Sequence, residues 1–247
     1  MDPIAISSDR DHTAIFDGAG SRESYFGGKS GSGTFQSLIN NIPPHRQYIE
    51  THLGAGAIMR MKFPAVKNYG IDIDKKIIDG WSGGSAFQFV VMDAVQFIKN
   101  KCILVDLEGA FIYCDPPYLI KTRKSGKQYR FEYSERQHVE LLETILTVGC
   151  DVMISGYWSE LYNDILSDWN SFCFESMTRH GKCTEWVWFN YPRPTVLHDY
   201  QYLGDTYRER ERIKRKRNRR IRSIKRMPAL ERNALLSEMG LVDGHNR

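Results

Sequence analysis

The sequence contains no apolar run of about 18 residues, the length that a membrane-spanning helix requires. Its N-terminus is polar and lacks the hydrophobic segment of a signal peptide. The five cysteines are odd in number and none are spaced as CxxC, so neither a disulfide framework nor a zinc site is indicated. We therefore expect a cytoplasmic protein with reduced thiols and no bound metal.

A phosphate-binding Walker A loop is also missing. That motif needs a glycine five positions before Gly28-Lys29, and Glu23 stands there. The stretch from Tyr25 to Lys29 is instead a glycine-rich turn, whose backbone can approach a ligand closely and whose lysine can meet a carboxylate or a phosphate. A plain turn without a ligand is the alternative interpretation of this stretch.

Charge is unevenly distributed along the chain. Residues 208 to 226 hold twelve Lys or Arg against Glu209 and Glu211, whereas the whole chain of 247 residues carries only +4, so the remainder is net negative. With 41% hydrophobic residues, the chain is long enough for one sizeable core. We expect one main domain followed by a basic tail.

Four short β-prone runs lead into acidic residues. Parallel strands present their carboxyl ends at one sheet edge, where doubly wound sheets bind ligands. The first run enters a Gly-x-Gly turn, a common way to place a nucleotide-like ligand at a helix N-terminus. Asp72 follows about 20 residues later, where a carboxylate usually holds a ribose diol, while Asp74 is placed to cap a helix. The runs are 47–50, 68–71, 87–92 and 111–114, with the acids Glu50, Asp72, Asp93 and Asp115.

The last of these runs enters the turn Asp115-Pro116-Pro117-Tyr118, our candidate catalytic segment. Two prolines remove two N–H donors and fix φ, so the carboxylate and the carbonyls beside it form a rigid set of acceptors. Such acceptors suit the exocyclic amine of a planar base, and Tyr118 offers a face on which the base can stack. The alternative is a strand that ends in a proline turn with a surface acid.

The second half of the sequence predicts further elements and two basic surfaces. We expect helices over 34–42, 135–148, 160–169 and 207–226, the second opened by a capping box of Ser134 and Gln137, and strands over 151–155, 172–177 and 184–190. Nucleic-acid contacts are expected from the loop 119–133, through Lys121, Arg123, Lys127 and Arg130, and from the tail, through Arg215, Arg217, Arg219 and Arg220. An ordinary solvated loop and tail are the alternatives.

The order YFGGK, IETHLGAG, GIDID and CDPPY resembles DNA adenine methyltransferases of the Dam kind over roughly residues 25 to 190. The resemblance implies an α/β class I methyltransferase fold, Rossmann-like, with a mostly parallel seven-stranded sheet and an antiparallel final strand. It also implies S-adenosylmethionine as cofactor and a flipped adenine as target. The cofactor-binding residues that it implies are Tyr25, Gly28, Lys29, Glu50, Gly54, Gly56, Asp72, Asp93 and Asp115.

Two features depart from that family. Thr51-His52 stands where the family usually has Pro-Phe, and we interpret His52 as a substituted wall residue rather than a base. Only 58 residues separate Gly56 from Asp115, which leaves no room for the inserted target-recognition domain of Dam-type enzymes. We therefore expect a compact, phage- or prophage-like form with a short or relaxed recognition sequence.

The sequence thus predicts an N-terminal arm (1–24), a methyltransferase domain (25–195) and a basic helical tail (196–247). The expected activity is methylation of adenine in double-stranded DNA. An RNA adenine methyltransferase and a non-catalytic basic DNA-binding protein on the same fold are the alternatives.

Overall fold

The computed structural model describes residues 28–31, 33–101, 107–123, 126, 129–178 and 181–241. Tyr25, Lys127 and the predicted arm 1–24 lie outside these ranges, so the predictions made for them stay predictions. By internal contacts the chain divides into Met1–Asp199 and Tyr200–Arg247.

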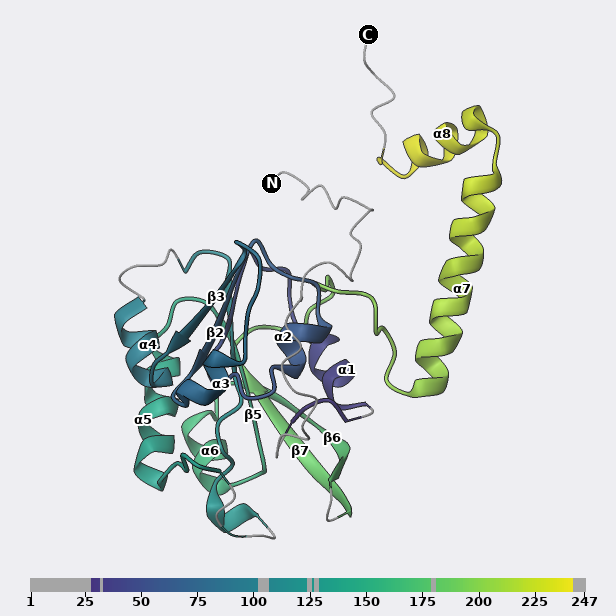
Figure 1. The fold of residues 1–247 in the computed structure, drawn as a ribbon. Coiled ribbons are helices and arrows are strands. Elements are labelled where there is room, and N and C mark those ends of the chain that lie inside the picture. Colours follow the sequence, from purple (N-terminus) through teal and green to yellow (C-terminus); the bar gives the residue numbers. More distant parts are fainter. Residues whose placement is uncertain are drawn as a thin grey trace. The chain divides into compact units, whose positions relative to one another are not determined.

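The first unit is a seven-stranded sheet with helices on both faces (Figure 1). Its strands are β1 (Gln47–Glu50), β2 (Lys67–Asp72), β3 (Phe87–Val91), β4 (Ala110–Cys114), β5 (Asp151–Gly156), β6 (Asn170–Thr178) and β7 (Gly181–Phe189). Its helices are α1 (Thr34–Ile39), α2 (Ala57–Met61), α3 (Lys75–Asp79), α4 (Ala94–Lys101), the 3-10 turn η1 (Ile120–Thr122), α5 (Glu135–Leu146) and α6 (Glu160–Ile165).

The strand order is β3-β2-β1-β4-β5-β7-β6. The pairs among β1 to β5 are all parallel, whereas β7 runs antiparallel to both β5 and β6. Strand order reverses between β1 and β4, which is where a doubly wound sheet opens a ligand crevice. This order, with its antiparallel strand, confirms the predicted class I methyltransferase fold. The described residues between Gly56 and β4 form only elements of this sheet domain.

The central strands are buried on both faces, as expected where helices cover a parallel sheet. All five residues of β4 are buried. Helices α4, α5 and α6 contact one another in sequence along one face (Figure 1). There Ile49, Ile112 and Ile154 of the sheet belong to one apolar cluster with Leu141 and Ile145 of α5. The sheet edge that carries the candidate acids is therefore anchored in a continuous core.

Several element boundaries differ from the predicted ones. The helix predicted over 34–42 ends at Ile39, four residues before Pro43, and the one predicted over 160–169 ends at Ile165. Strands β6 and β7 are longer than predicted because they pair along their whole length as a hairpin. The capping box at α5 is confirmed: the Gln137 N–H bonds the Ser134 hydroxyl, and the Gln137 side chain accepts from the Ser134 N–H.

The second unit contains α7 (Tyr207–Arg226) and α8 (Ala229–Glu238). Thr206 caps α7 by accepting from the Glu209 N–H, and the helix ends just before Pro228, as the sequence predicts. No residue of α7 is buried. None of the helices in the described ranges combines the length and the apolar character needed to cross a membrane.

Gly70 in β2 tests how tightly the sheet packs. A Cβ at this position would lie 2.7 Å from the Phe89 ring and 2.8 Å from Leu53. We expect Gly70→Ala to lower the free energy of unfolding by about 1–3 kcal/mol, because a well-packed core resists an added methyl group. Gly84→Ala is the control, since no atom lies within 4 Å of its Cβ position. Urea unfolding gives the free energy of unfolding of both variants. An equal loss of stability in the two would contradict tight packing around Gly70.

Candidate cofactor and catalytic site

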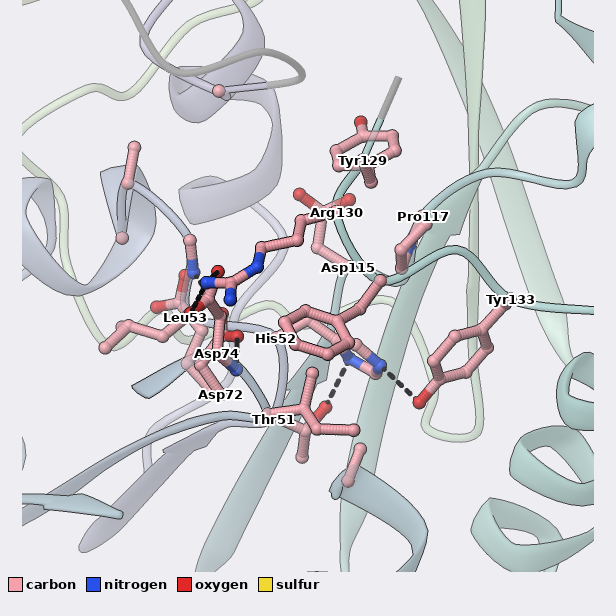
Figure 2. Close-up of a pocket in the computed structure, with 18 of the residues that line it drawn as sticks. Thr51, His52, Leu53, Asp72, Asp74, Asp115, Pro117, Tyr129, Arg130 and Tyr133 are labelled. Carbon is pink, nitrogen blue, oxygen red and sulfur yellow. Dashed lines mark hydrogen bonds and ion pairs between the residues drawn. The ribbon is translucent and has the colours of Figure 1, made fainter. Parts of the chain in front are cut away.

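The carboxyl ends of the first four parallel strands surround one open pocket (Figure 2). Its free space is about 800 Å³, part of it continuous with solvent. Glu50, Asp72, Asp93 and Asp115 all line it, so the structure brings together the four acids that the strand pattern predicts. Gly28, Lys29, Gly54 and Gly56 from the predicted set line the same pocket.

The Gly-x-Gly turn after β1 needs its glycines. Gly54 and Gly56 have φ values of 46° and 56°, in the left-handed region that disfavours side chains. A Cβ on Gly56 would also lie 2.3 Å from the Trp81 ring, which packs against the outside of the turn. The backbone therefore passes close to the pocket with no side chain at these two positions.

Several pocket acids accept hydrogen bonds from backbone N–H groups. The Asp72 carboxylate accepts from the N–H groups of Gly54 (2.9 Å) and Asp74 (2.8 Å), which locks the turn to the end of β2. Burial raises the pKa of Asp72 above its usual range, and these hydrogen bonds oppose the shift. Asp93 accepts from the Gln96 N–H at the start of α4. Asp74 caps α3, as predicted, by accepting from the Lys76 N–H.

Glu50 lies beneath the turn and is buried. Its Oε2 accepts from the Tyr48 hydroxyl (2.9 Å) and from the Met59 N–H (3.0 Å). Burial raises the pKa of Glu50 to about 8 despite these hydrogen bonds. The nearby Lys62 is also buried, and its pKa falls to about 7. At neutral pH Glu50 is therefore mostly protonated, whereas Lys62 keeps its proton in only part of the molecules.

Asp115 follows β4 and is bonded by two side chains of the site. Its Oδ1 lies 2.8 Å from the Lys29 ammonium and accepts from the Ser155 hydroxyl at 2.8 Å. Burial raises the pKa of Asp115, while the ion pair with Lys29 opposes that shift. The pKa of Lys29 is raised because Asp115 and Glu185 outweigh the effect of burial. In the part of the chain that the structure describes, Asp115 Oδ2 has no hydrogen-bond partner.

Tyr118 differs from the sequence-based expectation. Its ring is largely covered, with the residue only 9% exposed, and Tyr157 packs edge-on with ring centroids 4.6 Å apart. The Tyr118 hydroxyl accepts from Lys29 (2.6 Å) and donates to Glu185 (2.8 Å). The predicted stacking face is therefore not open in this structure. Asp115 and Pro117 line the pocket instead.

His52 forms part of the pocket wall, as the sequence indicates. Its ring nitrogens lie 2.9 Å from the Thr51 hydroxyl and 3.0 Å from the Tyr133 hydroxyl (Figure 2). Burial lowers the pKa of His52 to about 3, so the ring is neutral at physiological pH. These contacts join the turn after β1 to the segment that precedes α5.

The loop between β4 and α5 is less available to nucleic acid than predicted. The Arg123 side chain is 5% exposed, pairs with Glu132 at 2.7 Å and donates to the Tyr118 carbonyl, so in this structure it is not presented to a phosphate. Arg130 stays largely exposed and reaches Asp74 across the pocket at 3.0 Å (Figure 2). Lys121 is also exposed, in an ion pair with Glu135.

The four tail arginines predicted to contact nucleic acid lie on α7. Arg215, Arg217, Arg219 and Arg220 are all exposed. Arg217 donates to the Tyr200 carbonyl of the same unit. A helix of this length extends about 30 Å, so its cations form a long basic surface.

Comparisons with known proteins add little about this site. No family model and no curated protein matches the sequence. Among solved structures, a magnesium protoporphyrin IX methyltransferase from Synechocystis with bound SAM is 13% identical, over 65% of this chain and 76% of that one, with a TM-score of 0.42. An N-methyltransferase from Bradyrhizobium japonicum is 12% identical over 64% and 93%, with a TM-score of 0.43. An rRNA methylase from Streptococcus thermophilus is 12% identical over the same shares, with a TM-score of 0.41.

Sequence reasoning missed three residues of the site. Ser155 closes β5 and holds Asp115, Tyr133 holds His52, and Glu185 on β7 holds Tyr118. A polar residue at the end of each predicted strand was the available signal for Ser155.

Glu50 predicts a distinct dependence of stability on pH. The folded protein keeps the Glu50 proton up to about pH 8, whereas an unfolded glutamate loses it near 4.5. Between these values the folded state binds more protons, so the Glu50 contribution to stability falls as pH rises. We expect Glu50→Gln, which keeps an acceptor without the charge, to gain about 1 kcal/mol or more relative to the parent between pH 5 and 8.5. Denaturant unfolding of the parent and the variant at pH 5 and at pH 8.5 tests this prediction. A difference in their free energies of unfolding that does not change with pH would contradict it.

Proposed function

We propose that this protein is an S-adenosylmethionine-dependent methyltransferase that methylates the exocyclic amine of adenine in double-stranded DNA. The observation that carries the proposal is that Asp115 and Pro117 of the proline turn line a pocket together with acids from the other three strand ends. Such a pocket suits a cationic cofactor and an amine substrate side by side.

The pocket residues fit the cofactor chemically. Its ammonium group, ribose hydroxyls and amine are all donors, and the strand-end carboxylates are acceptors. The bare turn at Gly54 to Gly56 lets a ligand approach the backbone, and Asp72 lies where a ribose diol is usually held. When bound, the cofactor supplies an electrophilic methyl group.

The catalytic turn acts by positioning. Asp115 Oδ2 and a proline carbonyl beside it each accept one hydrogen of the amine, which directs the nitrogen lone pair toward the methyl group. Lys29 pairs with Oδ1 and favours the ionised carboxylate. The amine is itself the nucleophile, so no covalent enzyme intermediate is needed. A duplex adenine has to leave the base stack to reach this turn.

The case for DNA rests on α7, whose dense positive charge fits phosphate contacts and counterion release. Transfer of labelled methyl groups to unmethylated duplex DNA, single-stranded DNA and RNA tests the substrate. We expect label at adenine N6 of the duplex, within a short or relaxed sequence. Label on RNA alone would favour an RNA methyltransferase, and cofactor binding without transfer would favour a non-catalytic DNA-binding protein.

Asp115→Ala removes one of the two amine acceptors. We expect methyl transfer to fall by about 100-fold or more, because the lone pair is no longer directed. Asp164→Ala, at an exposed carboxylate of α6, is the matched control and keeps parental activity. Single-turnover transfer rates measure both. Activity of the Asp115 variant within tenfold of the parent would rule out the catalytic assignment.

The basic surface of α7 predicts that the affinity for duplex DNA falls as the salt concentration rises. Replacing Arg215, Arg217, Arg219 and Arg220 with Gln should reduce the slope of log K against log salt by about 2 to 4, since each phosphate contact contributes about 0.9. The matched control neutralises the exposed Lys67, Lys75, Lys76 and Lys99 of the sheet domain. Fluorescence anisotropy with duplex DNA measures the slopes, and equal slopes for both variants would contradict a DNA role for α7.

A further inference from the structure

One buried carboxylate of the site has no part in the reaction as described so far. Glu185 on β7 is 7% exposed, accepts from the Tyr118 hydroxyl at 2.8 Å and lies 3.5 Å from the Lys29 ammonium. We propose that Glu185 is a positioning residue for methyl transfer, which orients the Tyr118 hydroxyl and thereby holds the Lys29 ammonium against Asp115. This inference rests on the proposed function.

The hydrogen bonds around Tyr118 have only one consistent direction. A phenol has a single hydrogen, and Lys29 is a donor only. The hydroxyl therefore donates to Glu185 and accepts from Lys29 at 2.6 Å. A second donor of the Lys29 ammonium meets Asp115 at 2.8 Å. Without an acceptor at position 185, the hydroxyl hydrogen loses its partner and the ammonium loses a fixed neighbour.

The chain of contacts crosses the sheet. Lys29 precedes α1, Asp115 and Tyr118 follow β4, and Glu185 lies on β7, one residue before the residue that pairs with the end of β5. The contacts therefore join three segments far apart in the sequence, at the same edge as the pocket. They fix Asp115 Oδ1, so the remaining oxygen of that carboxylate presents a defined acceptor to the substrate amine.

The charges of Lys29, Asp115 and Glu185 also indicate that Glu185 does more than stabilise the fold. One ammonium faces two buried carboxylates, and a buried carboxylate costs folding energy unless it is paired and hydrogen-bonded. The ion pair of Lys29 with Asp115 is already balanced. Glu185 adds a negative charge that this pair does not require, and its closest partner is the Tyr118 hydroxyl.

Kinetics of Glu185→Ala, Glu185→Gln and Tyr118→Phe test the inference, after the parent's transfer to duplex DNA has been measured. We expect Glu185→Ala to lower kcat about 10- to 100-fold, the usual cost of a misplaced reacting group, with KM for DNA and the cofactor Kd changed less than about twofold. Glu185→Gln keeps an acceptor for the hydroxyl and should stay within about fivefold of the parent. The double variant Tyr118→Phe with Glu185→Ala should be no slower than Tyr118→Phe alone, because both substitutions remove the same hydrogen bond between these two side chains.

Glu175→Ala is the matched control. This carboxylate lies on the neighbouring β6, is exposed and accepts from the Thr184 hydroxyl, so its loss should leave kcat unchanged. Additive effects of Tyr118→Phe and Glu185→Ala, or parental kcat in Glu185→Ala, would overturn the inference. If Glu185→Ala fails to fold, Tyr118→Phe alone tests the contact, and a parental kcat in that variant would overturn the inference. A parent that transfers no methyl group to any nucleic acid would instead overturn the proposed function.

Discussion

The buried ion pair between Lys29 and Asp115 is the interaction on which the site depends. It joins the glycine turn before α1 to the turn after β4, with both side chains largely removed from water. Further hydrogen bonds stabilise a buried pair of this kind, and here Ser155 bonds Asp115 Oδ1 while the Tyr118 hydroxyl bonds the Lys29 ammonium. Removing Lys29 leaves two buried carboxylates without their cation, at a cost of about 3–5 kcal/mol, whereas removing Asp115 leaves the ammonium 3.5 Å from Glu185.

The sequence predicted those features whose place in space follows from their place along the chain. Parallel strands of similar length end at the same edge, so Glu50, Asp72, Asp93 and Asp115 were expected to meet, and they do. The proline turn and the Gly-x-Gly turn were visible for the same reason, since each follows its strand directly. Helix ends were predicted less well, because α1 and α6 end at Ile39 and Ile165 and tertiary packing, not periodicity, decides those positions.

Contacts between distant segments could not be read from the sequence. Glu185 reaches Tyr118 because β7 pairs with β5 in one particular register, which no local pattern specifies. The sequence indicated that Arg123 is a free cation in the loop, but in the structure it forms an ion pair with Glu132, nine residues later. Tyr157 packs against the Tyr118 ring, whose type alone indicated an open stacking surface. Residue type predicted the chemistry of these groups but not their accessibility.

The pocket acids also hold the fold, and this shared role limits how the site can change. Asp93 and Asp74 cap the helices α4 and α3, and Asp72 fixes the backbone of the glycine turn. Loss of a cap costs about 1 kcal/mol, so a substitution that tunes ligand affinity at these positions also weakens the scaffold. Asp115 is bonded through side chains alone. Substitutions that inactivate the protein or change its substrate are therefore better tolerated by the fold at Asp115 than at the three acids that accept hydrogen bonds from backbone N–H groups.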